Sequence, residues 1–139
     1  MKFLLEIITP VRQAFSEEVD MVVAPTKNGM VGVLAHHEPL FSSLTDGEIK
    51  ITSGRKEYFF AIGGGFMEVG IDKVMILVSR AAHADELNES EIKKAQEAAR
   101  EAIANKASGA ELAGAQAMLR RSLIELKVFR RRKPHSPSF

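Results

Sequence analysis

The sequence predicts an all-β N-terminal domain, an antiparallel sandwich of about ten strands, followed by a C-terminal α-helical hairpin. Two observations carry this prediction. Residues 2–79 alternate apolar and polar side chains with a period of two, and turn signals interrupt them every few residues. Residues 88–132 instead repeat apolar residues at helical spacing and carry a helix start signal at two points. Many short strands in close succession favour a sandwich or a flattened barrel.

The strands are expected between turns that are rich in glycine, asparagine and aspartate. Asn28-Gly29 is the strongest hairpin signal, and Asp46-Gly47 marks another turn. Residues His36–Leu40 are expected to be irregular, because Pro39 cannot donate to the centre of a strand ladder. The expected strands are Lys2–Thr9, Ala14–Ser16, Val19–Ala24, Val31–Leu34, Glu48–Thr52, Lys56–Ala61, Phe66–Val69 and Val74–Ser79.

Two capping boxes predict two helices joined by a tight turn. Asn88 and Glu91 form the first box, and that helix is expected to end just before the second box, which Ser108 and Glu111 form. The second helix is expected to reach Arg132, and the short joint implies an antiparallel hairpin. The expected apolar faces are Ile92, Ala95, Ala99, Ala102 and Ile103 in the first helix, and Leu112, Ala115, Leu119, Leu123, Leu126 and Phe129 in the second.

The change of pattern near residues 80–86 divides the chain. We expect residues 1–84 to form the β-sandwich domain, residues 85–133 the helix–turn–helix domain and residues 134–139 a disordered tail. The absence of cysteine excludes disulfides and thiolate chemistry. No apolar run approaches the roughly 20 residues that span a bilayer. Glu6 interrupts the apolar N-terminus, which argues against a signal peptide and for a cytosolic chain.

The net charge of +1 conceals a cationic C-terminal end. Complementing a helix macrodipole explains two or three of these cations, and a cluster of this size also predicts contact with an acidic surface. Nucleic acid ranks low as that surface, because no aromatic residue alternates with the cations to stack on bases. The cations are Arg120, Arg121, Lys127, Arg130, Arg131, Arg132 and Lys133.

Residues that could carry chemistry do not converge. His36 and His37 are adjacent, so on an extended chain they point to opposite faces and cannot easily share a metal ion. The glycines at 63–65 lead into a strand and not into a helix, so they are read as a bulge or a close backbone approach and not as a nucleotide loop. We therefore expect no catalytic residue, no metal and no cofactor, and a binding or regulatory subunit.

Two motifs stand out in the predicted β-domain, the stretch Gly29–Leu40, GMVGVLAHHEPL, and the stretch Gly64–Val69, GGFMEV. The first resembles the pattern G-x-x-G-(I/V)-(L/Y)-x-x-H-x-P-L of a known family, the epsilon subunit of bacterial F-type ATP synthases, with His37 at the histidine position. The second resembles that family's second signature. The opening Ile8-Thr9-Pro10 and the alanine-rich hairpin also match, so the resemblance covers essentially the whole chain.

The resemblance implies a non-catalytic subunit of the central rotor stalk, with a ten-stranded sandwich and a helical hairpin. It implies contact with the gamma subunit and the ring of c subunits, and with the alpha and beta subunits through the C-terminal helices. Such a subunit couples proton-driven rotation of the ring to ATP synthesis and inhibits ATP hydrolysis through its hairpin. It lies on the cytoplasmic face of the bacterial plasma membrane, held there peripherally by the complex.

The resemblance also assigns residues. The cations Arg120, Arg121, Arg130 and Arg131 are expected to meet an acidic loop of the beta subunit. Some family members bind ATP at a motif (I/L)-D-x-x-R-A, where this chain has Asn88 for the aspartate and Glu91 for the arginine, so no ATP binding is expected. The residues expected to contact the c ring or gamma are Asn28, Gly29, Met30, Val31, Gly32, His37, Glu38, Pro39 and Leu40.

Two other classes remain open at this stage. A free-standing adaptor or nucleic-acid-binding domain with a basic helical tail would bind duplex DNA with a steep salt dependence. A small enzyme of sandwich fold would need a convergent polar pocket, which the sequence does not suggest.

Overall fold

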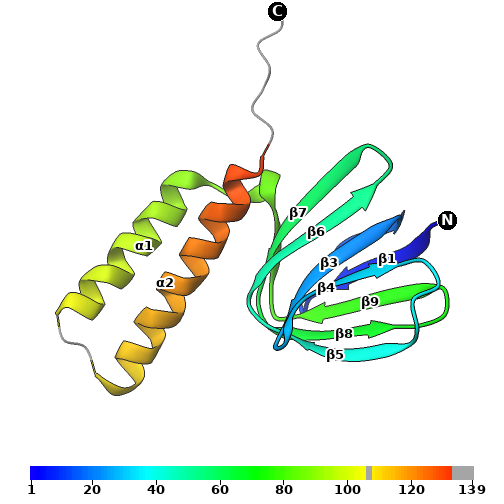
Figure 1. The fold of residues 1–139 in the computed structure, drawn as a ribbon. Coiled ribbons are helices and arrows are strands. Elements are labelled where there is room, and N and C mark those ends of the chain that lie inside the picture. Colours follow the sequence, from blue (N-terminus) through cyan, green and yellow to red (C-terminus); the bar gives the residue numbers. More distant parts are fainter. Residues whose placement is uncertain (106–107, 133–139) are drawn as a thin grey trace, which may run out of the picture. The chain divides into compact units, whose positions relative to one another are not determined.

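A computed structural model describes residues 1–105 and 108–132 of the chain (Figure 1). It contains two compact units, Met1–His83 and Ala84–Phe139. The predicted tail at 134–139, together with Lys133, lies outside the described residues.

The first unit holds ten strands within the described residues, arranged in two layers (Figure 1). One layer runs β4-β3-β6-β7-β10 and the other β5-β8-β9-β1-β2, and a single residue pair, Thr26 with Leu44, joins β3 to β5. The strands are β1 Phe3–Ile8, β2 Gln13–Val19, β3 Met21–Thr26, β4 Gly29–Leu34, β5 Leu40–Leu44, β6 Gly47–Ser53, β7 Lys56–Ile62, β8 Gly65–Val69, β9 Lys73–Val78 and β10 Ala81–His83.

The predicted sandwich is confirmed, with one departure from antiparallel pairing. Strands β1 and β9 are parallel neighbours, with Leu5 opposite Val74 and Ile7 opposite Ile76. Parallel neighbours cannot be joined by a tight turn, so the segments that connect them must cross over. Here that crossover contains most of the domain, which brings the first strand of the chain beside the ninth.

The apolar alternation seen in the sequence forms the core between the layers. Along β1 the residues Phe3, Leu5 and Ile7 are buried and the residues between them are half-buried. Phe15 on β2 packs edge-on against Phe60 on β7, with ring centroids 5.8 Å apart. Burial of these side chains stabilises the sandwich by about 1.5–3 kcal/mol each relative to exposure.

Two strands were missed from the sequence, β5 and β10. β5 carries Ser42 and Ser43 at its centre and follows Pro39, so it lacks the branched apolar run that indicates a strand. β10 has only three residues and pairs antiparallel with the end of β7. The β3–β4 hairpin is confirmed, but its two-residue loop is Lys27–Asn28, one residue earlier than the predicted Asn28-Gly29, and Gly29 begins β4 at φ 111°.

The second unit is the predicted helical hairpin, preceded by a short 3-10 helix, η1, at Ala84–Glu86. Helix α1 spans Glu89–Ala104 and α2 spans Gly109–Arg130. The first capping residue is confirmed, because Asn88 Oδ1 accepts a hydrogen bond of 3.1 Å from the Glu91 amide. The second is wrong in detail: Ser108 is extended at the cap position, but its side chain makes no capping hydrogen bond in the described part of the chain.

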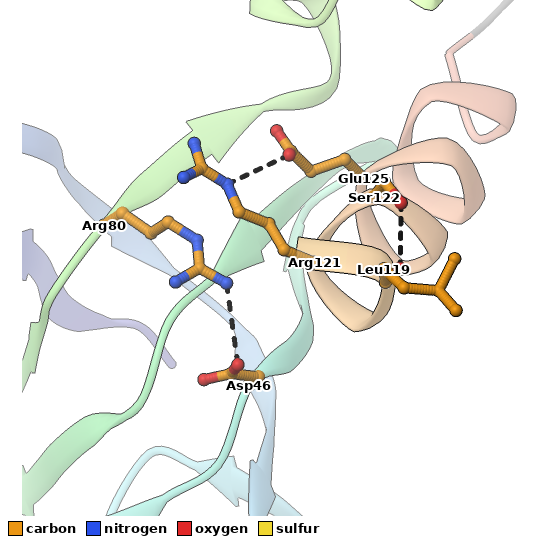
Figure 2. A network of polar contacts seen from close by, with 6 residues as sticks. All are labelled: Asp46, Arg80, Leu119, Arg121, Ser122 and Glu125. Atoms are coloured by element: carbon orange, nitrogen blue, oxygen red, sulfur yellow. Dashed lines mark hydrogen bonds and ion pairs between the residues drawn. The ribbon is translucent and has the colours of Figure 1, made fainter. Parts of the chain in front are cut away.

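The apolar face predicted for α2 is wrong at one position. Leu123 is 47 % exposed, whereas Ser122 and Val128, which were not predicted to be buried, are buried. Ser122 tolerates burial because its hydroxyl donates a 2.8 Å hydrogen bond to the Leu119 carbonyl (Figure 2). The first helix behaves as expected, with Ile92 and Ala99 buried.

Candidate functional site: exposed surfaces of the sandwich and the hairpin

The tip of the β3–β4 hairpin is an exposed turn that is closed by side-chain hydrogen bonds. The Thr26 hydroxyl donates to the Gly29 carbonyl at 2.6 Å and accepts from the Asn28 amide at 3.2 Å. Gly29 has a φ of 111°, which residues with a Cβ rarely adopt. Met30 follows and is 59 % exposed. This turn holds the predicted contact residues 28–30 away from the core.

The segment His36–Pro39 forms a second exposed turn, after β4. The backbone amide of His37 donates to the Leu34 carbonyl at 3.2 Å, and His37 Nδ1 donates to the Glu38 carbonyl at 2.7 Å. His36 has a positive φ of 65°, and its Nε2 lies 2.9 Å from the Met1 sulfur. The two imidazoles therefore have different partners, and no metal-binding cluster is found among the described residues.

Sequence reasoning missed an exposed aromatic patch that continues from this segment. We define the aromatic patch as Phe41, Phe66 and Leu77, on the outer face of β5, β8 and β9. Phe41 and Phe66 are stacked at 5.4 Å, and Phe66 pairs directly with Leu77. All three are exposed, by 67 %, 48 % and 44 % respectively. The outward alternation of Phe66 was visible in the sequence, but Phe41 lay outside every predicted strand.

The four cations predicted to meet an acidic partner lie on the surface of α2 and its C-cap. Arg120, Arg121, Arg130 and Arg131 are all exposed. The two pairs are separated by ten residues, about 15 Å along a helix. Arg121 is already engaged within the helix, because its Nε lies 3.1 Å from Glu125 Oε1 (Figure 2).

The start of α1 carries the opposite charge. Glu89 Oε1 lies 2.8 Å from Lys93 Nζ, one turn further along the helix. The hydrogen bond and charge of Lys93 hold the pKa of Glu89 below its ordinary value, and the charge of Arg130 adds to this effect. Glu89 therefore has its ion-pair partner one turn away on its own helix.

The triglycine segment is structural, as predicted. A Cβ on Gly65 would overlap the Leu77 carbonyl, and a Cβ on Gly63 would overlap the Ser79 hydroxyl. Only glycine permits these close approaches between β8 and β9 and before β8. Arg80 reaches back to Asp46, with 3.6 Å between Nη2 and Oδ2 (Figure 2). The segment thus allows neighbouring strands to lie close together, and it leads into a strand and not into a ligand-binding loop.

The arrangement suits macromolecular contact better than chemistry. The described residues contain no helix long and apolar enough to cross a membrane. The exposed features described above are two turns, an aromatic patch and a cationic helix, all of which offer open surface to a partner.

The chain resembles known proteins along nearly its whole length. A family model for the ATP synthase delta/epsilon chain, beta-sandwich domain, matches residues 2–84. An ATP synthase epsilon chain of Dehalococcoides mccartyi is 40 % identical over 135 residues, 96 % of each chain. Another, of Herpetosiphon aurantiacus, is 41 % identical over 133 residues, which are 96 % of this chain and 98 % of the relative.

A solved structure agrees with this relationship. The matching chain belongs to a cryo-EM structure of the Euglena gracilis mitochondrial ATP synthase, OSCP/F1/c-ring. It superposes with a TM-score of 0.68 at 25 % identity and covers 93 % of this chain and 78 % of that chain. Sequence and fold lead to the same result: the chain belongs to the family of ATP synthase epsilon chains.

Proposed function

We propose that this chain is a non-catalytic subunit of the central stalk of an F-type ATP synthase, where it couples rotation of the c ring to ATP synthesis and restrains ATP hydrolysis. One observation carries the proposal: identity of about 40 % to epsilon chains extends over 96 % of the chain and therefore includes the helical hairpin as well as the sandwich. The complex of the Euglena relative contains F1 and the c ring, which supports a position between them.

The sandwich would bind gamma and the c ring through its exposed turns. The proposed contact residues are those of the β3–β4 tip, Asn28–Gly32, and of the following turn, His37–Leu40. Met30 provides an exposed apolar side chain at the first turn. The aromatic patch begins at Phe41, directly after the turn at His37–Leu40. This turn and the patch therefore form one continuous candidate surface. Exposed apolar groups next to polar turns are typical of a binding interface.

The hairpin would act as the inhibitory arm. Arg120, Arg121, Arg130 and Arg131 are exposed, and we propose that they contact an acidic loop of the beta subunit. The alpha subunit would be approached through the same helices. Arginine suits this role because its planar guanidinium can bind carboxylates in a bidentate manner. The complex would hold the chain peripherally at the cytoplasmic face of a bacterial plasma membrane.

The deciding experiment compares ATP hydrolysis by the assembled catalytic head with the full-length chain and with a chain that stops at Asp85. We expect the full chain to suppress hydrolysis and the truncated chain, which keeps the whole sandwich unit, to relieve suppression. Co-purification with gamma verifies that the truncated chain has assembled. Equal hydrolysis with both assembled chains would contradict an inhibitory arm and leave a structural stalk subunit.

The nucleic-acid alternative has weak support. The feature that supports nucleic-acid binding is the cationic end of the hairpin. The family relationship offers another explanation for these cations, namely contact with another subunit. Binding of the free chain to duplex DNA that weakens steeply between 50 and 200 mM salt, as phosphate contacts require, would revive it.

A further inference from the structure

Strand β4 forms an open edge of the sandwich. Its six residues, Gly29–Leu34, pair with β3 in unbroken register, and no second strand pairs with β4 within the described part of the chain. Natural sheets usually protect such an edge with charged side chains, proline, a bulge or short length, because an open edge can pair with another strand. β4 contains no charged residue and no proline.

The other edge strands carry protection of this kind. β10 has only three residues. β2 carries Glu17 and Glu18, and its pairing with β1 includes a register shift. β5 follows Pro39, and its last residue, Leu44, pairs with Thr26 of the other layer. The unprotected edge of β4 is therefore the exception among the described strands.

The register of β3 and β4 determines which backbone groups point to this open edge. Residue pairs in an antiparallel ladder alternate between hydrogen-bonded and non-hydrogen-bonded. Pro25, opposite Met30, has no N–H group, and its carbonyl accepts a 3.0 Å hydrogen bond from the Thr45 amide, on the side away from β4. Pro25 and Met30 therefore form a non-hydrogen-bonded pair. It follows that the backbone groups of Met30, Gly32 and Leu34 point to the open edge.

The same three positions also share the exposed face of the strand. Met30 and Leu34 are exposed apolar side chains, and Gly32 lies between them. A Cβ on Gly32 would lie 2.8 Å from the Met21 Cε, the flexible end of a side chain. The Leu34 carbonyl already accepts from the His37 amide at 3.2 Å, so Leu34 offers its amide to the edge. The edge is thus an uncharged, apolar strip with a glycine at its centre.

We propose that this edge pairs antiparallel with β4 of a second copy of the chain, about a two-fold axis at Gly32. In this register the edge is complementary to itself, as a two-fold interface requires. Gly32 pairs with Gly32 of the second copy through both backbone groups, and the Leu34 amide donates to the Met30 carbonyl of the other chain. Met30 and Leu34 of opposite chains become cross-strand neighbours. Lys27 at the tip comes to the end where the second copy carries Glu38, so the charges there are opposite.

The dimer is a state of the free chain. A single pair of short strands buries less than the roughly 1,200 Å² of a stable complex, so the pairing is weak and reversible. Residues 28–32 also belong to the proposed contact surface for gamma and the c ring, so one chain cannot use this edge for both. This competition rests on the proposed function. Pairing in the dimer covers an edge that otherwise invites aggregation before assembly.

Amide hydrogen exchange of the free full-length chain, followed by NMR, tests the dimer without any substitution. We expect the amides of Gly32 and Leu34 to exchange slowly at high protein concentration and fast at low concentration, because only the second copy accepts their hydrogen bonds. The amides of Val31 and Val33 face β3 and should be protected at both concentrations. Fast exchange at Gly32 and Leu34 at every concentration, with a monomeric mass in sedimentation equilibrium, would overturn the proposal.

Charges at the two-fold axis test the register. Gly32→Lys and Gly32→Glu each place like charges directly opposite each other, so each should raise the dissociation constant of the dimer at least about tenfold. An equimolar mixture of the two variants should restore dimers, because lysine then lies opposite glutamate. Val11→Lys, which adds the same charge at an exposed turn away from β4, is the control and should leave the dimer unchanged. Folded variants that remain monomeric when mixed would refute an axis at Gly32.

Gly32→Pro decides the matter if the charged variants do not fold. The substitution removes the amide at the centre of the interface and leaves the hydrogen bonds to β3 intact, and proline is tolerated where the N–H group of an edge strand faces outward. Circular dichroism checks that the variant is folded. Loss of the dimer supports the proposal, and a dimer of unchanged strength would contradict it.

The gamma subunit separates the dimer from the proposed function. Gamma should dissociate the dimer and form a complex that holds one copy of the chain, and a complex with two copies would exclude the competition. If the unsubstituted chain is monomeric and Gly32→Lys weakens only its binding to gamma, the edge belongs to a strand of the partner and the dimer is refuted. A chain that dimerises but does not bind gamma would instead contradict the proposed function, and the dimer would stand.

Discussion

Phe41 and Phe66 stack on the outer face of the sandwich, with ring centroids 5.4 Å apart and an interplanar angle of 24°. They come from β5 and β8, which pair antiparallel, so the register of two strands distant in sequence places them together. Solvent covers much of both rings in the free chain. A stacked aromatic pair is a typical anchor of an interface, because burying it gains apolar area with little loss of side-chain entropy.

Replacing Phe41 with alanine should weaken assembly with the stalk more than it weakens the fold. We expect affinity for the gamma and c-ring assembly to fall about tenfold or more, as truncation of an aromatic anchor does. Val11→Ala is the control, because Val11 is 89 % exposed and lies outside the aromatic patch. Equal loss of affinity in both variants, measured by titration of the assembly, would exclude the patch as an anchor.

Gly65→Ala should destabilise the sandwich by about 1–3 kcal/mol or more, the range for an overpacked site. The added methyl group would overlap the Leu77 carbonyl and crowd the Val78 Cα at 2.7 Å, and neither is a flexible side-chain end. Gly114→Ala in α2 is the matched control: its Cβ would have no neighbour within 4 Å among the described residues. That change should stabilise the helix by about 0.5–1 kcal/mol. Urea unfolding, followed by circular dichroism, measures both.

The two helix caps should respond differently to the same kind of substitution. Asn88→Ala removes the hydrogen bond to the Glu91 amide and should cost about 1 kcal/mol of hairpin stability. Ser108→Ala removes a side chain that makes no capping bond in the described part of the chain, so its cost should be clearly smaller. Helical content during thermal unfolding provides the comparison, and an equal cost at both caps would contradict it.

Acid should destabilise the hairpin through Glu89. Its pKa in the folded chain is depressed below the ordinary 4.5 by Lys93 and, to a lesser degree, by Arg130. A depressed carboxyl pKa contributes stability that is present above the unfolded value and is lost as pH falls through the folded value. The helical content of the full chain, followed by circular dichroism, should therefore fall as pH drops below about 4.5, and the fall should be smaller in Glu89→Gln than in the unsubstituted chain. An identical fall in both would assign the loss of helix to other carboxyls.

Local signals in the sequence predicted most of the fold, and non-local pairing explains what they missed. Turn residues, alternation and the Asn88 cap each act within a few residues, so they can be recognised without knowledge of the tertiary contacts. β5 has no such signal, and its pairing with strands distant in sequence, chiefly β8, makes it a strand. In α2 the sequence predicted that Leu123 is buried, but the buried residues include Ala115, Ser122 and Leu126. Their spacing of seven and four residues fits a heptad pattern, which is hard to recognise in the sequence because one of its positions is a serine.

ATP should not stabilise this chain, in contrast to relatives that carry the ATP motif at the start of the first helix. Asn88 takes the place of the motif's aspartate, and its side-chain oxygen is occupied by the Glu91 amide. Glu91 takes the place of the arginine and would repel phosphate from an end of the hairpin where Asp85, Glu86 and Glu89 already gather. Millimolar ATP should leave the melting temperature of the full chain unchanged in a thermal-shift experiment. Binding with a dissociation constant 100-fold below the ligand concentration would add about 2.7 kcal/mol, so a clear upward shift would show that the acidic start of α1 does not exclude the nucleotide.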